Sequence, residues 1–202
     1  NSTSKFIPAN QAKRKARLSC MRKSDLPFGS EFSPSQIDLK AVLDLAYHHA
    51  GNWKAFENAV REKYFDLNET TEYNRRKLAN NTKLGMIAYG IIDRNIHFTE
   101  FGHELYSLRN DEKALYRALA RHILLNLNGA VLVQCVQDIQ ASGETVDLVK
   151  LRARLEERGV HFPRGGKHAS IMRLWLEKAG VFSTGWNVNE AALEEILNAP
   201  IE

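Results

Sequence analysis

The sequence has few cysteines and no long apolar run, and these two absences exclude several classes of protein. Only two cysteines occur in 202 residues, Cys20 and Cys135, far apart and in different contexts. So few cysteines exclude a disulfide-rich scaffold and favour a reducing cytoplasm, with neither thiol bridged or catalytic. No stretch approaches eighteen consecutive apolar residues, so no membrane span and no membrane partner are predicted. Residues 1–10 lack an apolar segment behind a basic start, so a secretory signal is not expected.

Motifs that carry enzyme chemistry are also missing. The sequence has no Gly-x-Ser-x-Gly elbow and no Gly-x-Gly-x-x-Gly loop, and Gly165-Gly166-Lys167-His168 lacks the longer pattern of a phosphate-binding loop. Asp38-Leu39-Lys40 matches the end of a metal-dependent nuclease motif, but it falls in the first turn of an expected helix instead of on a strand. The seven histidines have no cysteine or carboxylate partners at recognised ligand spacing. We therefore predict no catalytic residue, no metal site and no cofactor in this chain.

The small excess of positive charge is confined to one part of the chain. The net charge is +4, but residues 1–36 hold seven basic and two acidic side chains, a net charge of +5, which leaves −1 for the remainder. The prolines and the basic stretch of residues 1–36 predict a flexible or surface-clinging arm that follows DNA phosphates. A solubilising tail or, in a eukaryotic protein, a nuclear-import signal is the alternative. The arm residues expected to contact DNA are Lys13, Arg14, Lys15, Arg17, Arg22 and Lys23.

The segment from Ile91 to Leu105 is the most informative part of the remaining sequence. It predicts two short strands joined by the polar turn Asp93-Arg94-Asn95, followed by a Thr-x-x-Gly start of a helix. Three amphipathic helices are expected before it, beginning near Ser35, Asn52 and Thr71. Three helices followed by a hairpin are typical of a winged helix-turn-helix module, in which the hairpin is the wing.

A second, weaker version of this pattern follows. An apolar helix at 111–127 is expected as a spine between two halves, and three further helices lead to a short hairpin at 181–188 and a last helix. The halves share a pattern and no convincing sequence repeat. We therefore predict a mainly α protein made of two tandem winged helix-turn-helix modules with short β-hairpin wings. The predicted parts are a basic arm at 1–36, the first module at 37–110, and the linker helix with the second module at 111–202.

The helix before each predicted wing is the candidate for base recognition. Arg or Lys pairs with guanine and Asn or Gln with adenine in the major groove, so a mixture of these residues on one helix face predicts DNA contact. An ordinary solvated helix face is the alternative. In the first module the candidates are Asn74, Arg75, Arg76, Lys77, Asn80, Asn81 and Lys83, with Arg94 at the wing tip. In the second module they are Arg164, Lys167, His168, Ser170 and Arg173.

The glycines at the start of the second candidate helix admit two interpretations. Gly165 and Gly166 would let a phosphate approach the backbone amides at a helix start, or they simply turn the chain.

Three stretches of the chain resemble a known class of protein. Leu84 to Ile92, Thr99 to Leu105 and Leu119 to Asn126 resemble winged-helix recognition regions of bacterial restriction endonucleases and related phage-defence proteins. The resemblance spans residues 37–190. It implies that this chain recognises a target sequence while a separate nuclease domain or subunit cuts. Because the chain shows no nuclease core, the resemblance implies the recognition part of a larger enzyme, or a partner subunit, in the bacterial cytoplasm at the nucleoid.

The sequence therefore predicts a sequence-specific double-stranded DNA-binding module that serves target recognition in a restriction or phage-defence system. Two alternatives stay open. A transcriptional regulator would dimerise through the helix at 111–127 and bind a palindrome, whereas two unlike modules predict an asymmetric site. A winged-helix protein-interaction subunit of a larger complex is the other alternative, favoured by the charge of −1 outside the arm.

Overall fold

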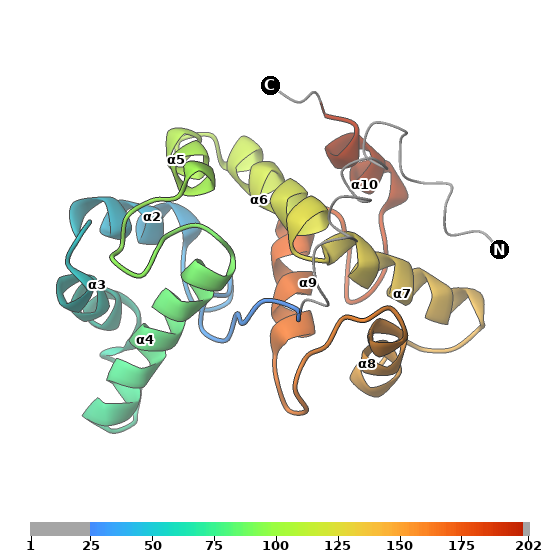
Figure 1. The fold of residues 1–202 in the computed structure, drawn as a ribbon, viewed down its shortest axis with the longest axis horizontal. Helices are drawn as coiled ribbons and strands as arrows, with labels where there is room; N and C mark the ends of the chain where they lie inside the picture. Colours follow the sequence, from blue (N-terminus) through green and yellow to red (C-terminus); the bar gives the residue numbers. More distant parts are fainter. Residues whose placement is uncertain (1–24, 200–202) are drawn as a thin grey trace. The chain divides into compact units, whose positions relative to one another are not determined.

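The computed structural model describes residues 25–199, which are mainly helical (Figure 1). The chain divides into two compact units. One unit is residues 27–115. In the described residues, the other contains 116–199 together with Leu26, whose backbone N–H donates to the carbonyl of His161 at 2.9 Å. Each unit is described by itself below.

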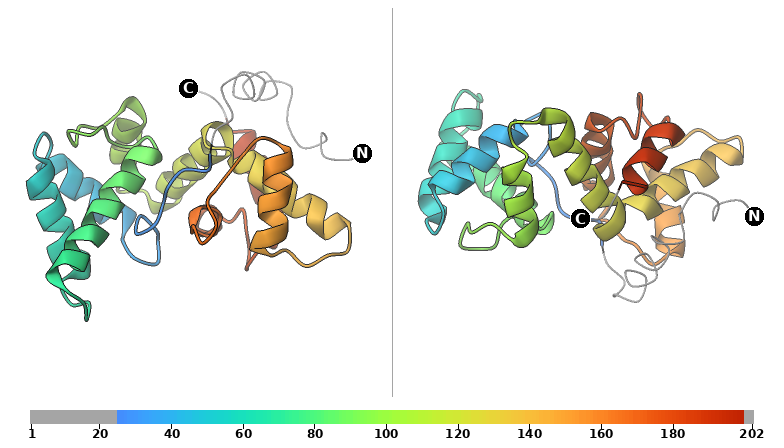
Figure 2. Two further views of the ribbon diagram at one scale, coloured as in Figure 1. Left: turned by 60° about the horizontal axis from the view of Figure 1, so that its bottom comes forward. Right: turned by 90° about the horizontal axis from the view of Figure 1, so that it is seen from above.

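The 27–115 unit is built from four α-helices and a π-helical turn. These are α2 (Leu39–His48), α3 (Trp53–Val60), η1 (Arg61–Phe65), α4 (Glu72–Ala88) and α5 (Glu100–Ser107). Each α-helix begins at a polar residue whose side chain accepts a backbone N–H three residues on, which satisfies a donor that the helix leaves open. The capping residues are Asp38, Asn52, Thr71 and Thr99. Helices α3 and α4 lie side by side in Figures 1 and 2.

The second unit contains α7 (Gly129–Ala141), α8 (Leu148–Glu157), α9 (His168–Lys178) and α10 (Glu190–Leu197). Helix α6 (Glu112–Asn126) begins in the first unit and supplies most of its length to the second. The core of this unit contains the fully buried Trp175 and further buried apolar residues from its other helices. These include Leu119, Ile123, Leu132, Val136, Leu151, Leu155 and Met172.

The predicted β-hairpin wings, and with them the winged helix-turn-helix modules, are wrong. The described residues contain no β-strand, and each expected wing is reduced to one antiparallel bridge, Ile92 with Phe98 and Phe182 with Val188. The mainly α part of the prediction is confirmed.

The reason lies in how the first hairpin turns. The Asp93 carboxylate accepts the backbone N–H groups of Asn95 and His97 at 2.8 and 3.0 Å, and Ile96 adopts a φ of +61°. A residue in the left-handed region cannot continue an extended strand. Helix α4 ends just before this turn and α5 begins just after it. No second pair of bridged residues can therefore form between the two arms of the hairpin.

The two units repeat one order of elements. Gly90 and Gly180, at φ of +78° and +82°, end α4 and α9. The carbonyl of Ile91 then accepts the N–H of Thr99 at 3.1 Å, and the carbonyl of Val181 accepts that of Asn189 at 2.8 Å. Thr99 and Asn189 cap the helices that follow. The likeness of pattern that the sequence predicts is thus a repeat of helix, single-bridge hairpin and helix.

No single helix among the described residues is long and apolar enough to cross a membrane. Helices α6 and α7 reach that length and composition only as a pair bent by 80°.

Candidate nucleic-acid interface

Helix α4 presents one face to solvent along its 17 residues. Its opposite face is fixed by the core: Ala79, Thr82, Gly85 and Met86 are buried. Gly85 packs so closely that a Cβ there would lie 2.5 Å from the Cβ of Phe32. This close packing sets the rotation of α4 and determines which side chains stay outside. This outer face carries the exposed Tyr73, Lys77 and Leu84 and the half-buried Asn80 and Asn81.

Three of the predicted DNA-contacting cations on α4 are engaged inside the unit. The Arg75 guanidinium donates two hydrogen bonds, at 3.2 and 2.9 Å, to the carbonyl of Asn68 and so fastens the loop before α4. Arg76 pairs with Glu72 at 2.7 Å. Lys83 lies 3.7 Å from the Glu57 carboxylate, and both side chains are largely buried. Arg75 and Lys83 therefore have structural roles that the sequence does not reveal.

The remaining predicted residues of α4 include the ones best placed to meet a ligand. Asn74 donates to the Thr70 hydroxyl at 2.9 Å. Within residues 25–199, by contrast, the side chains of Lys77, Asn80 and Asn81 make no hydrogen bond or ion pair. Residues three and four apart share one side of a helix, so these three form a continuous polar patch.

Carboxylates moderate the charge beside this patch. A cavity of about 660 Å³ borders it, lined by Glu31, Asn68, Glu69, Thr70, Asn74, Lys77, Leu78 and Asn81. Two carboxylates face one ammonium in that lining. The patch is therefore rich in donors and acceptors without being strongly positive, which suits recognition of base edges better than attraction of phosphates.

Arg94 lies exposed in the turn of the first hairpin, beyond the C-terminal end of α4. Backbone N–H groups of His97 and Asn95 hold the pKa of the neighbouring Asp93 carboxyl below its usual value, so a negative charge persists next to Arg94. From Lys77 to the end of α4 is about 16 Å at the rise of an α-helix. Arg94 thus belongs to a different part of the surface from the α4 patch.

The predicted residues of the second unit do not form a comparable face. Arg173 donates to Glu177 at 2.8 Å and to the carbonyl of Gly185 at 3.3 Å, which ties α9 to the second hairpin. Lys167 and Arg164 are exposed in the loop before α9, and Ser170 is half-buried. Because most sides of α9 are covered by the core, it is a packing helix.

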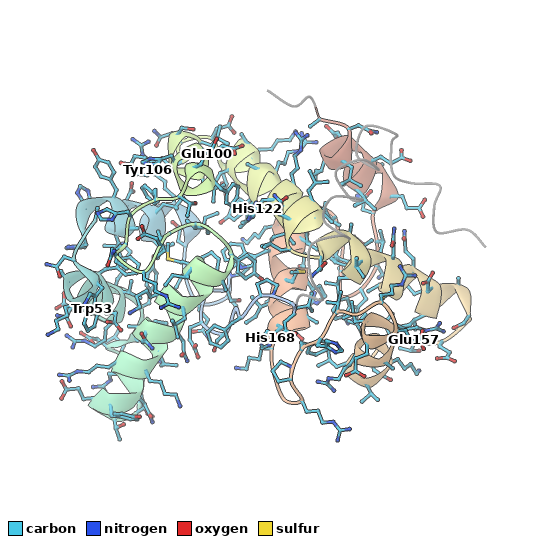
Figure 3. The ribbon with its side chains drawn as sticks, viewed as in Figure 1. Trp53, Glu100, Tyr106, His122, Glu157 and His168 are labelled. Carbon is cyan, nitrogen blue, oxygen red and sulfur yellow. The ribbon has the colours of Figure 1, made fainter. Side chains whose placement is uncertain are left out.

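His168, at the start of α9, is also a packing residue (Figure 3). Its ring lies 6.4 Å from that of Phe162. A Cβ on Gly166 would approach its Nδ1 to 2.7 Å and the carbonyl of Pro163 to 2.9 Å. Gly165, at a φ of +72°, turns the chain, whereas Gly166 allows His168 and the carbonyl of Pro163 to approach closely.

Lowering the pH from about 7 to about 5 is expected to destabilise the unit that contains His168. Burial lowers the pKa of this imidazole below 6.5, although Asp25 acts in the opposite direction. Near pH 6.5 the unfolded chain takes up a proton that the folded chain resists, so stabilisation present above that pH is lost as the pH falls. Urea unfolding at several pH values should show a smaller loss for His168→Gln than for the unchanged protein. His161→Gln is the control. Equal losses of stability in His168→Gln and in the unchanged protein would contradict the attribution of the pH effect to His168.

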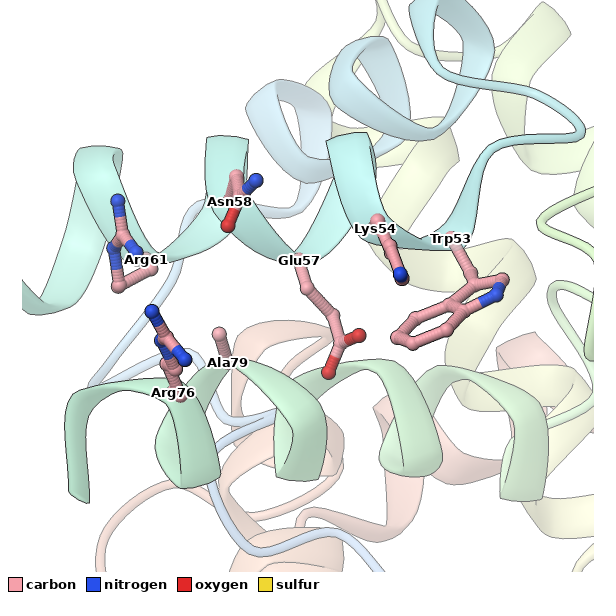
Figure 4. A pocket seen from close by; sticks show the side chains of 7 residues that line it. All are labelled: Trp53, Lys54, Glu57, Asn58, Arg61, Arg76 and Ala79. Carbon is pink, nitrogen blue, oxygen red and sulfur yellow. The ribbon is translucent and has the colours of Figure 1, made fainter. Parts of the chain in front are cut away.

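Sequence reasoning missed a groove between α3 and α4. It has a volume of about 410 Å³ and is lined by Trp53, Lys54, Glu57, Asn58, Arg61, Arg76 and Ala79 (Figure 4). Trp53, at the start of α3, is 46% exposed. One feature of the sequence could have indicated that Trp53 is exposed. It stands at the start of a helix, directly after the cap Asn52 and before a lysine.

The remaining candidates for chemistry are potential metal ligands, a cysteine and the nuclease-like tripeptide. Between residues 25 and 199, no three His, Cys, Asp or Glu side chains come together as ligands. Burial raises the pKa of the Cys135 thiol to about 11. Asp38, in the nuclease-like tripeptide, caps α2 by accepting the N–H of Ala41 at 2.9 Å. The predicted arm contacts, Lys13, Arg14, Lys15, Arg17, Arg22 and Lys23, lie outside the described residues.

Comparison with protein-family models, with curated proteins and with solved structures finds no significant match to this chain.

Proposed function

We propose that this chain binds double-stranded DNA in a sequence-specific manner through the exposed face of α4. The observation that carries the proposal is the patch of Lys77, Asn80 and Asn81, whose side chains make no hydrogen bond or ion pair within the described residues. An α-helix about 10–12 Å in diameter fits the major groove, which is about 12 Å wide. There a lysine meets guanine acceptors, and an asparagine amide pairs with adenine through both its donor and its acceptor.

Apolar side chains flank the patch and add to its capacity for recognition. Tyr73 precedes Lys77 by one helical turn, and Leu84 follows Asn80 by another. Both are exposed. In the major groove an apolar side chain can contact the methyl group of thymine, so the two residues extend the readable site at either end of the patch.

Attraction to the phosphates is assigned to the basic arm. Residues 27–115 contain eleven basic and thirteen acidic residues, a net charge of −2, so this unit alone gains little from the DNA charge. Residues 1–36 carry +5. We therefore expect removal of the arm to weaken binding to all duplexes about equally and to reduce its dependence on salt.

The place of this DNA binding in a cell is a separate part of the proposal. Target recognition for a restriction or phage-defence system, with cleavage by another domain or subunit, rests on the sequence resemblance of residues 84–92, 99–105 and 119–126. The supporting experiment is a cleavage assay with Mg²⁺ in the presence of proteins encoded beside this chain.

Replacing Lys77, Asn80 and Asn81 together with alanine is expected to weaken binding to the preferred duplex by tenfold or more, since each good base contact contributes about 1–3 kcal/mol. The preferred duplex is first obtained by selection from random double-stranded DNA at two salt concentrations. Affinity is then measured by fluorescence anisotropy. Gln36→Ala with Lys40→Ala is the matched control, because it removes one exposed amide and one exposed ammonium from outside α4.

Two results would overturn the proposal. One is a selection that enriches no sequence. The other is an enriched duplex that the triple variant binds as tightly as the unchanged protein. Arg75 is left intact in this design because it holds the loop before α4.

Exposed apolar residues favour a second candidate function, the binding of a protein partner. Leu67 is 98% exposed and Tyr73 is 75% exposed, both close to the start of α4. An apolar centre of this kind suits a protein interface, whose strongest contacts are large side chains buried on association. Co-purification of a partner with the unchanged protein, lost in Leu67→Ser with Tyr73→Ser, would support this function if no duplex is enriched.

A further inference from the structure

We propose that the groove between α3 and α4 binds single-stranded nucleic acid, with a base stacked on Trp53 and the phosphates held by Lys54, Arg61 and Arg76. The groove is lined by residues other than the Lys77, Asn80 and Asn81 patch. The inference therefore adds a second mode of binding and does not depend on recognition of duplex DNA.

Trp53 is held in place although nearly half of it is exposed. It is the first residue of α3, directly after the cap Asn52, whose side chain accepts the N–H of Ala55. The ammonium of Lys83 lies over its ring, 4.9 Å from the centroid, and the Lys83 side chain is only 13% exposed. Glu57 holds that ammonium at 3.7 Å. The Lys54 ammonium also lies over the indole, 5.5 Å from the centroid, but Lys54 is exposed and can move aside to leave the indole for a second planar group.

Basic side chains outnumber acidic ones in the lining of the groove where it continues from Trp53. Its lining contains three cations, Lys54, Arg61 and Arg76, and a single carboxylate, Glu57. That carboxylate is already paired with Lys83. Lys54 makes no ion pair within the described residues, so the groove offers one open cation together with two arginines whose carboxylate partners lie outside its lining.

The two arginines are paired with carboxylates, and an anion can replace the partner of one of them. Arg76 and Glu72 form their ion pair with side chains 66% and 67% exposed. Arg61, whose own side chain is only 20% exposed, lies 3.2 Å from Asp66 and 3.7 Å from Glu62. Pairs of solvent-exposed charges contribute little to stability and are screened by salt. A phosphate can therefore take the place of the Glu72 carboxylate beside Arg76 without unfolding the helices.

The dimensions and the order of these groups match a short stretch of nucleic acid. The volume of about 410 Å³ is typical of a small-molecule site. From Lys54 on α3 to Arg61 at the start of η1 is about 10 Å at the rise of an α-helix, which leaves room for a base and its neighbouring phosphates. Glu57 extends from α3 toward α4 in this space, and Asn58 lies on the α3 side of the lining (Figure 4).

Nucleic acid fits this groove better than an acidic peptide does. Sequence-tolerant single-strand binding combines a basic groove with an aromatic side chain on which a base stacks, and the groove offers both. An acidic peptide would satisfy the cations but would place no planar group on Trp53.

The test measures binding of fluorescent ten-nucleotide dT and dA strands to the full chain by anisotropy at two salt concentrations. Trp53→Ala is expected to weaken binding by about tenfold, with Trp53→Phe retaining part of the affinity. Trp186→Phe, outside the groove, is the control and should change nothing. Lys54→Glu, an exposed position, should weaken binding and lower its salt dependence.

Several outcomes would overturn the inference. These are no binding of either strand, equal binding by Trp53→Ala in a protein shown to be folded by circular dichroism, or stronger binding of an oligoglutamate peptide than of the strands. Replacing Lys77, Asn80 and Asn81 with alanine should leave single-strand binding unchanged. Failure of duplex recognition and failure of the groove are therefore separate results.

Discussion

Replacing Gly102 with alanine is expected to destabilise the 27–115 unit by about 3 kcal/mol. A Cβ at this position would lie 2.0 Å from the carbonyl oxygen of Ile91 and 3.0 Å from Cδ1 of Phe98. The same oxygen accepts the N–H of Thr99 at 3.1 Å, and Thr99 in turn accepts the N–H of Gly102 at 3.0 Å. The first turn of α5 thus rests directly on the backbone of the hairpin, and a methyl group must separate the two.

The sign of this effect is informative because alanine normally favours a helix over glycine by about 1 kcal/mol. Unfolding in urea, followed by circular dichroism, gives the change in free energy, and faster hydrogen exchange should appear in α4 and α5. Gly143→Ala is the comparison. It stands at a φ of +79° with nothing within 4 Å of a built Cβ, so it should cost only about 1–2 kcal/mol. An alanine at 102 as stable as glycine would contradict the close contact.

Replacing Trp175 with alanine is expected to destabilise the unit that contains α9 by about 4 kcal/mol. The side chain is fully buried, and its ring lies 6.3 Å from that of Tyr116. Removal of a large buried aromatic side chain loses its burial and leaves a cavity that a packed core fills only in part.

The measurement for Trp175→Ala is urea unfolding monitored by far-ultraviolet circular dichroism, since the substitution removes a fluorophore. Trp53→Ala is the control within the same chain, because a half-exposed indole should cost well under half as much. A loss for Trp175→Ala no larger than that for Trp53→Ala would show that α9 is not the centre of its unit.

The helix boundaries were largely predictable because they depend on neighbours in the sequence. Asn52, Thr71 and Thr99 cap helices as expected, and Asn189 caps α10 in the same way. Their side chains bond to backbone groups only three residues away, so sequence alone carries the signal. The first helix begins later than expected, since Asp38 rather than Ser35 supplies the cap.

The hairpins were not predictable in the same way. Ile91, Ile92 and Ile96 are buried, and their apolar character suggested strands. They are buried as a compact turn, in which Ile96 takes a left-handed conformation that β-branched residues rarely adopt. Burial produces the same sequence pattern whether or not strands pair, so the pattern could not distinguish the two.

The candidate site on α4 was predicted only in part, because some partners of its side chains lie outside the helix. The basic and amide residues of α4 were identified, but the sequence could not separate engaged from unengaged ones. Arg75 bonds to a carbonyl seven residues earlier, and Arg173 to one twelve residues later. Such partners depend on how loops fold back, as does the exposure of Trp53 in the groove between α3 and α4.

The repeat of helix, hairpin and helix has a consequence for how this protein can change. In α9 the core-facing residues Trp175, Met172 and Leu176 occupy most of the helix surface, so few substitutions there are compatible with folding. In α4 the side chains of Lys77, Asn80 and Asn81 support nothing else within the described residues. Packing therefore restricts substitution in α9, whereas these three positions of α4 tolerate it. A library randomised at these three positions should remain folded in most of its members and offers a direct route to altered ligand preference.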